Sequence, residues 1–326
     1  DDGSGIGEAR NAVLVFKGVP IGGTPMVTFP LTEGRKSGFL APTFTTTSNT
    51  GLQLVVPYYW DIAPNRDLTL FPRYMTNAGL MLGADARYLE RGYFGETRFE
   101  FMNDASYGNT LRYAISTRHN QTFVPGVGLV LDLNHVSDND YARDFPFSHV
   151  FERPGINRRL LPESAIVSYN RGGPWSGTFQ LSEFQVLQDT NGTPIVQPYG
   201  RLPQVNLNYA NYDDSGFGLT MGSQFTRFTH SSLVQGDRIV LNPRVTYNYL
   251  QGPGYFVRPS FAIHSTAYNL DHVTDPLMTA PTRTLPTFSV DSGLVFERDA
   301  TFLGRDAVQT LEPRLFYTYT PYKAQN

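Results

Sequence analysis

Apolar and polar residues alternate along most of this chain, and this period of two predicts β-strands. The clearest run, from Arg238 to Leu250, places Ile239, Leu241, Pro243, Val245, Tyr247 and Tyr249 on one face and Asn242, Arg244, Thr246 and Asn248 on the other. The pattern recurs in residues 204–212, 287–297 and 310–319, and in the second of these Phe288, Val290, Leu294 and Phe296 share a face. We expect roughly fourteen strands, most of them long enough to cross a bilayer, for which about 9–11 tilted residues suffice. No stretch has a convincing helical period.

Clusters of Gly, Asn, Asp and Pro separate these runs, as in residues 90–95, 170–175, 211–216 and 250–254, and they predict tight reversals between antiparallel strands. Two longer interruptions, residues 138–162 and 271–286, are charged and contain proline. We expect them to be extracellular or inward-folded loops, because barrel proteins keep the turns on one side short and the loops on the other long.

The organisation changes near Pro42. Residues 1–42 consist of short strand-like runs broken by turns, which suggests the last part of a small separate β-domain, whereas residues 43–326 carry the long alternating runs. The acidic, glycine-rich start lacks a signal-peptide pattern, and a strand pattern ends the chain without a closing turn. We therefore expect a fragment of a longer protein at both ends.

The stretch from Leu54 to Met75 has prolines in two strand-like runs. Pro57 and Pro72 cannot donate to a strand ladder, so these runs are expected to form a weakened edge or seam. An ordinary alternative places Pro57 at the start of a strand and Pro72 at a bulge. Pro64, followed by Asn65, is expected in a turn.

The aromatic residues Tyr58, Tyr59 and Trp60 follow Pro57 directly. Clustered aromatics at the end of a membrane strand typically form an interface belt. Contact with a substrate is the less favoured interpretation.

The composition favours a membrane sheet. Apolar residues make up only 40% of the chain, yet aromatics reach 13%, with 19 Tyr and 23 Phe. A sheet with one polar face, one lipid-facing face and aromatic girdles has this balance. A formal net charge of -3 without a basic stripe argues against nucleic acid as a partner. No apolar run is long enough for a transmembrane helix.

Catalytic and metal sites are not expected. The chain has no cysteine, no HExxH, GxSxG or phosphate-binding loop, and its six histidines are widely spaced. The only starting points for a lipase-type search are His230 with Ser231 and Ser232, and His264 with Ser265, and a strand His beside Ser is usually a polar-face residue. We therefore expect no enzyme, no cofactor and no bound metal.

Several long strings are similar to one known family. RKSGFLAP at 35–42, PYYWDIAPNRD at 57–67, FPRYM at 71–75, GADARYLE from Gly83, FQVLQD from Phe184, VFERD from Val295 and QTLEPRLFYTYTPY near the end occur in the same order as in the outer-membrane lipopolysaccharide-assembly family LptD. The resemblance covers almost the whole chain. It implies an all-β fold, with residues 1–42 as the end of a periplasmic β-jellyroll and residues 43–326 as about the first half of a large antiparallel transmembrane β-barrel of roughly twenty-six strands.

The resemblance also implies a function. In this family the jellyroll guides the acyl chains of lipopolysaccharide, the headgroup passes through the barrel lumen, and the molecule leaves sideways between the first and last strands. By that resemblance Pro57 and Pro72 match the prolines of the lateral gate. The implied partners are lipopolysaccharide, outer-membrane lipid, the plug lipoprotein LptE and, through the jellyroll, the periplasmic bridge protein LptA. Because the chain lacks cysteine, the disulfides that control assembly in some members are not formed within it.

Two further sets of residues are candidates for substrate contact. Val13, Val15, Val19, Met26 and Phe29 could line an acyl-chain groove or equally belong to a small β-core, and Asn242, Arg244 and Asn248 could contact headgroup sugars or phosphates from the lumen. The expected location is the outer membrane of a Gram-negative bacterium, with the N-terminal part in the periplasm. A porin-like passive channel is the alternative function, and a soluble β-sandwich carbohydrate-binding module is less favoured.

Overall fold

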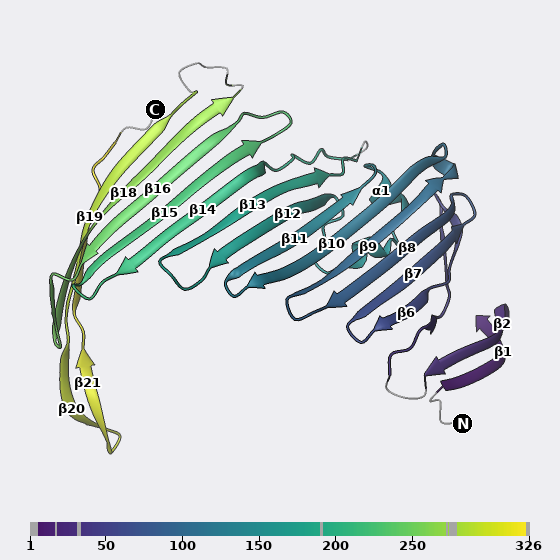
Figure 1. Ribbon diagram of the computed structural model, residues 1–326, viewed down its shortest axis with the longest axis horizontal. Coiled ribbons are helices and arrows are strands. Elements are labelled where there is room, and N and C mark those ends of the chain that lie inside the picture. The colour runs from purple at the N-terminus through teal and green to yellow at the C-terminus, as the bar shows by residue number, and fades with distance from the viewer. Residues whose placement is uncertain are drawn as a thin grey trace. The chain divides into compact units, whose positions relative to one another are not determined.

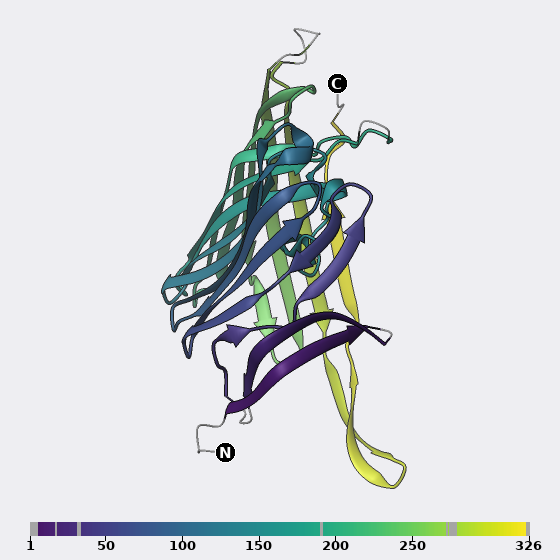
Figure 2. The same cartoon turned by 90° about the vertical axis from the view of Figure 1, so that its right-hand side faces the viewer.

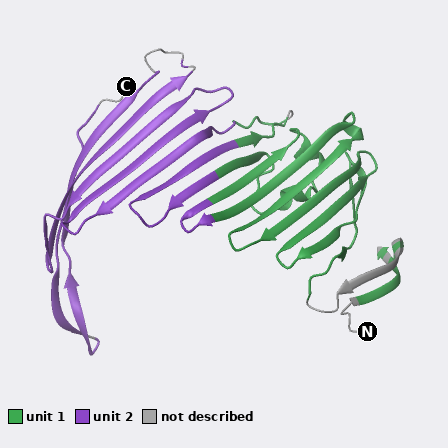
Figure 3. Cartoon of the chain, in the orientation of Figure 1, with its two compact units in different colours: residues 1–122, 129–165, 184–196 green, residues 123–128, 166–183, 197–326 purple. Residues whose placement is uncertain are grey.

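The computed structural model describes residues 6–16, 18–30, 34–189, 192–271, 273 and 279–323, and these form an almost entirely antiparallel β-structure (Figure 1). This confirms the all-β fold class, and the pairings are consistent with part of a β-barrel. No helix in the described part of the chain is long and apolar enough to cross a membrane. The chain divides into two compact units (Figure 3): unit 1 comprises residues 1–122, 129–165 and 184–196, and unit 2 the remainder.

The N-terminal residues form a hairpin of two long strands, β1 (Ile6–Phe16) and β2 (Val19–Pro30). Gly18 makes the turn with a φ of 81°, a conformation that favours glycine. The short strands expected from the sequence are instead two long strands of one hairpin, and a single irregularity in their pairing falls between Leu14 and Val15.

The sheet of unit 1 begins with short strands and continues with long ones. Its strands are β3 (Gly38–Phe39), β4 (Thr43–Thr47), β5 (Gly51–Val55), β6 (Tyr58–Ala63), β7 (Arg66–Met75), β8 (Gly79–Leu89), β9 (Tyr93–Asp104) and β10 (Thr110–Val124). β3 pairs with β6, β4 with β5, and both β5 and β6 pair with β7. β7, β8, β9 and β10 then follow in order. Because β3 pairs with β6, Gly38 and Phe39 lie in this sheet, before the boundary expected at residue 42.

Strands β11 (Val127–Val136), β12 (Leu160–Asn170) and β13 (Trp175–Val186), like the end of β10, contribute residues to both units. The segment between β11 and β12 contains the short helices α1 (Tyr141–Asp144) and η2 (His149–Glu152), and η1 (Ala105–Tyr107) follows β9. Residues 138–162 are therefore folded, although they lack a period in the sequence.

Unit 2 is a sheet of long strands joined by tight turns. Its strands are β14 (Gly200–Tyr212), β15 (Phe217–Thr229), β16 (Gln235–Tyr247), β17 (Leu250–Gly252), β18 (Tyr255–Asp271), β19 (Thr282–Leu294), β20 (Phe296–Phe302), β21 (Arg305–Leu311) and β22 (Arg314–Tyr319). The order is β13, β14, β15, β16, β18, β19 and β22, while in the described part of the chain β20 and β21 pair with each other as a separate hairpin that extends from β19 (Figure 2).

Two details of unit 2 correct the sequence prediction. Strand β19 already begins at Thr282, so the interruption expected at 271–286 is shorter; residues 272 and 274–278 lie outside the described part. Phe296 belongs to β20, because the ladder breaks at Val295, and it does not continue the face of Phe288 and Val290. Each predicted turn cluster contains a chain reversal, at residues 91–92, 172–174, 214–216 and 253–254, but the flanking residues of the clusters belong to strands, and Leu250–Gly252 forms the short strand β17.

Both sheets separate an apolar face from a polar one. On the apolar face of unit 1, large side chains remain exposed although each belongs to a regular strand: Leu70, Tyr74, Leu80, Leu82, Phe99, Phe101, Leu111, Tyr113 and Ile115. In unit 2 the register places Ile239 beside Phe225 and Val245 beside Phe261, which confirms the predicted face as far as Tyr247, where β16 ends; Asn248 and Tyr249 lie beyond that strand. Exposed apolar patches on soluble monomers rarely exceed about 300–600 Å². A continuous apolar face over several strands therefore disfavours a soluble β-sandwich.

Candidate functional site

Pro57 and Pro72 lie at one level of the unit 1 sheet. β5 and β6 hold one register against β7, since Val55 pairs with Arg73 and Tyr58 with Leu70. The residues between them follow that register, so Val56 lies opposite Pro72 and Pro57 opposite Phe71. Pro57 thus falls in the gap that separates β5 from β6, and Pro72 falls inside β7.

The hydrogen bonds at this level are incomplete. The N–H of Val56 donates to the carbonyl of Pro72 at 3.2 Å, and the N–H of Leu40 donates to the carbonyl of Pro57 at 2.8 Å. In a regular hydrogen-bonded antiparallel pair the two residues exchange two bonds. Proline has no N–H, so each of these pairs is limited to one bond.

A third proline, Pro42, lies at the same level. Four residue steps separate Phe39 from Thr43, whereas three separate their partners Tyr58 and Val55, so the segment between β3 and β4 holds one extra residue. Pro42 occupies this bulge, a position where strand prolines are tolerated. Pro42 was not among the seam residues predicted from the sequence. The equal spacing of prolines 42, 57 and 72 along the chain was the available signal.

Next to the prolines, side-chain hydrogen bonds and ion pairs connect the strands in addition to the backbone hydrogen bonds. Arg35, just before β3, forms an ion pair with Asp67 and donates to the hydroxyl of Tyr59 at 2.7 Å and to the carbonyl of Pro64 at 3.1 Å. Arg87 of β8 binds both oxygens of the same Asp67, at 2.8 and 2.9 Å. We call Arg35, Tyr59, Asp67 and Arg87 the latch. It connects the segment that enters β3 to β6, β7 and β8.

The predicted aromatic belt is divided between the two faces. Tyr59 contributes to the latch on the polar face, while Tyr58 and Trp60 point to the opposite face because strand residues alternate. Trp60 is exposed, and the ring of Tyr58 packs edge-on against Phe39 with 5.1 Å between centroids. The three aromatics therefore do not form one girdle.

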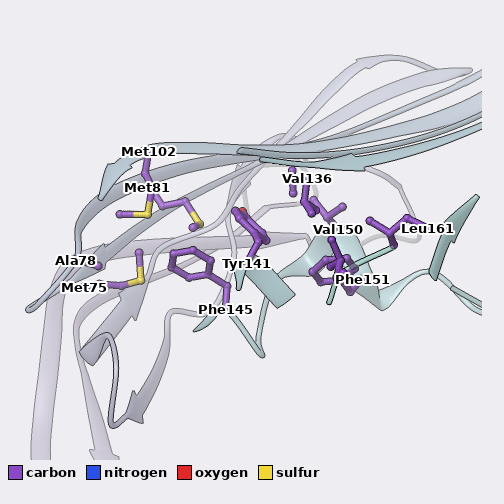
Figure 4. Packing of buried hydrophobic residues seen from close by; sticks show 12 residues of the cluster. Met75, Ala78, Met81, Met102, Val136, Tyr141, Phe145, Val150, Phe151 and Leu161 are labelled. Atoms are coloured by element: carbon purple, nitrogen blue, oxygen red, sulfur yellow. The ribbon is translucent and has the colours of Figure 1, made fainter. Parts of the chain in front are cut away.

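The segment 138–162 folds onto the polar face of unit 1, the inward-folded alternative of the sequence prediction. Its residues Tyr141, Phe145, Val150 and Phe151 are buried with side chains of the strands, and Figure 4 shows Met75, Met81 and Phe145 on one side of this cluster and Val150, Phe151 and Leu161 on the other. Gly83 provides the space for His149, because a Cβ there would come within 2.4 Å of its ring.

Glu100 of β9 is the polar centre under this segment. Its carboxylate is almost completely buried; it pairs with His149 at 2.7 Å and accepts hydrogen bonds from Tyr141 at 2.9 Å and Ser148 at 2.5 Å. Arg73 lies 3.6 Å from Glu100 and donates to the carbonyl of Phe147 at 2.6 Å. A buried charge is costly unless it is paired in this way. Burial and the adjacent Glu100 raise the pKa of Tyr141 well above its ordinary value, so its hydroxyl is a donor.

Arg112 of β10 is a second buried anchor. Its guanidinium binds both oxygens of Asp138 at 2.7 and 2.9 Å, Asp104 at 3.0 Å and Asp144 at 3.1 Å, and it lies 4.8 Å from the ring centre of Phe145. Burial acts to raise the pKa of Asp138, but the hydrogen bonds from Arg112 and Ser137 outweigh it and hold this pKa below its ordinary value. Asp138 and Asp144 belong to the folded segment, so the network ties that segment to the strand.

On the polar face of unit 2, residues of β14, β15, β16, β18, β19 and β22 and of the adjoining turns line a cavity of about 380 Å³. Arg244 and Asn248, two of the three predicted headgroup contacts, line it, whereas Asn242 does not. Arg258, Ser260 and Asp291 join them from β18 and β19.

The N-terminal candidates are only partly described. Val13 and Val15 lie on β1 and are 60% and 55% exposed. The side chains of Val19, Met26 and Phe29 lie outside what the structure describes. The irregularity in the β1–β2 pairing falls between these two valines, so strand alternation alone does not assign them to one face of the hairpin.

The two histidine positions considered for catalysis have other contacts. Both ring nitrogens of His230 bond to the backbone, Nδ1 accepting from Ser232 and Leu233 at 3.0 Å and Nε2 contacting the carbonyl of Gln197 at 2.8 Å. His264 contacts Thr266 at 3.1 Å, whereas Ser265 bonds to Thr284. Among the described residues, no group of three or more His, Cys, Asp or Glu could hold a metal ion.

Comparisons with known proteins give a consistent result. The family model described as "LPS transport system D" (LptD) matches residues 110–326. The chain is 42% identical to an "LPS-assembly protein LptD" of Paraburkholderia xenovorans (strain LB400) and 41% identical to one of Burkholderia ambifaria; each alignment covers 100% of this chain and 41% of the relative. A relative of the same name from Ralstonia nicotianae is 40% identical over 98% of this chain and 40% of its own length. The chain thus spans about two fifths of these relatives.

A solved structure titled "Bacterial polysaccharide outer membrane secretin" aligns over 83% of this chain and 91% of that chain, with a TM-score of 0.30 and 9% identity. At that score the likeness carries no information about the fold.

Proposed function

The chain belongs to the LptD family, and we propose that it is part of an outer-membrane protein that inserts lipopolysaccharide into the outer leaflet. The observation that carries this proposal is the family match over residues 110–326, together with relatives that align with the whole chain. A transport system needs no catalytic group, in line with the non-enzymatic interpretation of the sequence.

The two-faced sheets support the proposed location. We propose that the apolar face meets outer-membrane lipid and that the polar face borders the path of the headgroup. The acyl chains of lipopolysaccharide are unfavourable in water, and its sugar-phosphate headgroup is unfavourable in hydrocarbon. The two parts of the molecule therefore require separate routes. Residues 1–42, with Val13 and Val15 exposed, are the proposed end of a jellyroll that guides the acyl chains and meets LptA, and residues 43–326 are the proposed barrel part that holds LptE.

The proline seam supports a lateral gate. In lipid each unsatisfied backbone group costs several kcal/mol, so strands rarely separate there. Pro57 and Pro72 each remove one ladder bond in advance, and Pro42 adds a bulge beside them. We propose that this seam lets β3 and β4 move at modest cost, and that lipopolysaccharide leaves between them and the last strand of the full-length protein.

A reversible lock tests the gate. Cysteines are placed at Thr45 of β4 and in the last strand of the full-length protein, and newly exported lipopolysaccharide is measured at the cell surface. Oxidation should stop export and reduction should restore it, while either single cysteine should export normally under both conditions. Normal export with the disulfide formed would exclude lateral exit at this seam.

A further inference from the structure

The cavity in unit 2 has the composition of a site for an anionic sugar. At about 380 Å³ it falls within the range of about 300–1,000 Å³ typical of small-ligand sites. Its aromatic lining includes Tyr212 and Phe316, and its polar lining comes from strands and from the adjoining turns.

The floor of the cavity is made of hydroxyl groups. Thr246 of β16 pairs in register with Ser260 of β18, and the Ser260 hydroxyl lies 2.7 Å from that of Ser289 on β19. Hydroxyl groups act as both donors and acceptors, which suits the hydroxyls of a sugar ring.

Two arginines flank this floor. Arg244 is two residues before Thr246 on β16, and Arg258 is two residues before Ser260 on β18, so both project from the polar face. Among the described residues no carboxylate lies within ion-pair distance of either guanidinium. Arg258 lies opposite Asp291 in the β18–β19 register, where it acts on the charge of that carboxylate at longer range, and it is 4.7 Å from the ring centre of Phe256. Arginine that is not paired within the protein is suited to bind phosphate or carboxylate through two parallel hydrogen bonds.

The acidic residues at the cavity are already engaged. Asp291 binds Arg314 through two hydrogen bonds of 2.7 Å each. Asp213 accepts hydrogen bonds from the Ser215 hydroxyl and the N–H of Phe217 within its own turn. The charge that is free to bind a ligand is therefore positive.

We infer that this cavity is a transit site for a phosphate- or carboxylate-bearing sugar of the lipopolysaccharide headgroup, held by Arg244 and Arg258 with Thr246, Ser260 and Ser289 beneath it. The inference rests on the proposed function. It assigns one position on the polar face to one part of the substrate.

The test uses a photo-reactive benzoylphenylalanine at Thr246 in the full-length protein in cells. Ultraviolet light should produce a lipopolysaccharide adduct at Thr246, and the adduct should fall about tenfold in the double variant Arg244→Ala, Arg258→Ala, the change that corresponds to about 1.4 kcal/mol. Asn242→Ala, on the same face but outside the cavity, is the matched control and should leave the adduct unchanged. The probe at Val245, on the apolar face, should give far less adduct.

The same cross-linking experiment in a host whose core sugars lack phosphate distinguishes phosphate from carboxylate as the group that the arginines bind. Loss of the adduct there assigns phosphate, and an adduct that persists and still depends on the arginines assigns carboxylate. An adduct that is independent of both arginines overturns the inference. A second probe at Val13 separates this failure from that of the proposed function: an adduct at Val13 without one at Thr246 overturns only the transit site, and none at either position contradicts transport itself.

Discussion

The N–H of Val56 donates a hydrogen bond of 3.2 Å to the carbonyl of Pro72, and Pro72 has no N–H with which to return it. The pair thus forms one backbone hydrogen bond, where a regular antiparallel pair forms two. A second ladder bond is missing at the next residue of this segment: the carbonyl of Pro57 accepts a hydrogen bond from the N–H of Leu40, but Pro57 has no N–H to donate in return. Other strands also contain proline, such as Pro243 in β16. What distinguishes the seam is that its prolines lie at one level of the sheet, Pro72 inside β7 and Pro42 and Pro57 in the breaks between β3 and β4 and between β5 and β6.

Replacing Pro57 and Pro72 with alanine should tighten the seam. Each new N–H can complete a ladder bond, to Leu40 and Val56 respectively, and each bond should stabilise the closed sheet by about 0.5–1.5 kcal/mol. Surface lipopolysaccharide should fall in the double variant and fall further when Pro42→Ala is added. Pro243 is a strand proline outside the seam, so the control variant Pro243→Ala should export lipopolysaccharide at the normal level. Equal export in all variants would show that the prolines have no gating role.

Disrupting the latch should release the segment before β3. Asp67 is the acceptor shared by Arg35 and Arg87, so Asp67→Asn removes the charge that both bind. Trypsin should then cleave after Arg35 or Lys36 several-fold faster in the purified full-length protein. Glu90→Gln, which breaks the exposed pair with Arg66, is the control and should not change this rate. An unchanged rate in Asp67→Asn would mean that the ladder alone holds the segment.

Removing Arg112 should detach the folded segment 138–162 from its strand. The guanidinium is buried with Asp104, Asp138 and Asp144, and removal of one partner from such a network costs about 3–5 kcal/mol. In Arg112→Ala, trypsin should cleave rapidly at arginines within the segment. Arg118→Ala in the same strand loses an exposed pair worth about 0–1 kcal/mol and serves as the control. Similar digestion of both variants would contradict the anchor role.

Acid should weaken the same anchor. The folded-state pKa of Asp138 lies below its ordinary value, so its interaction with Arg112 is fully present above the ordinary pKa of Asp, about 3.9, and is lost as the pH falls through the lower folded value. Hydrogen-exchange protection of residues 138–162, corrected for intrinsic rates, should decrease over this range. Asp138→Asn should be less protected already at neutral pH and should show a smaller acid step; an identical acid step would assign the loss to other carboxylates.

The sequence by itself determined the elements and their faces. Alternation in 238–250 correctly separated Ile239 and Leu241 from Asn242 and Arg244, and turn clusters correctly marked the reversals, because side-chain direction in a strand and turn conformation are local properties. The motifs 57–67 and 309–322 likewise indicated the family, and the comparisons show that the chain belongs to it.

Only the tertiary structure decided which residues meet. The register between β5, β6 and β7 brought Pro57 and Pro72 to one level and added Pro42, and the docking of 138–162 buried Glu100 against His149. The same is true of the cavity, where Arg244 and Arg258 come from different strands. Such contacts depend on pairing between residues that are distant in the chain, and a one-residue change of register would reverse every face while leaving the sequence pattern the same.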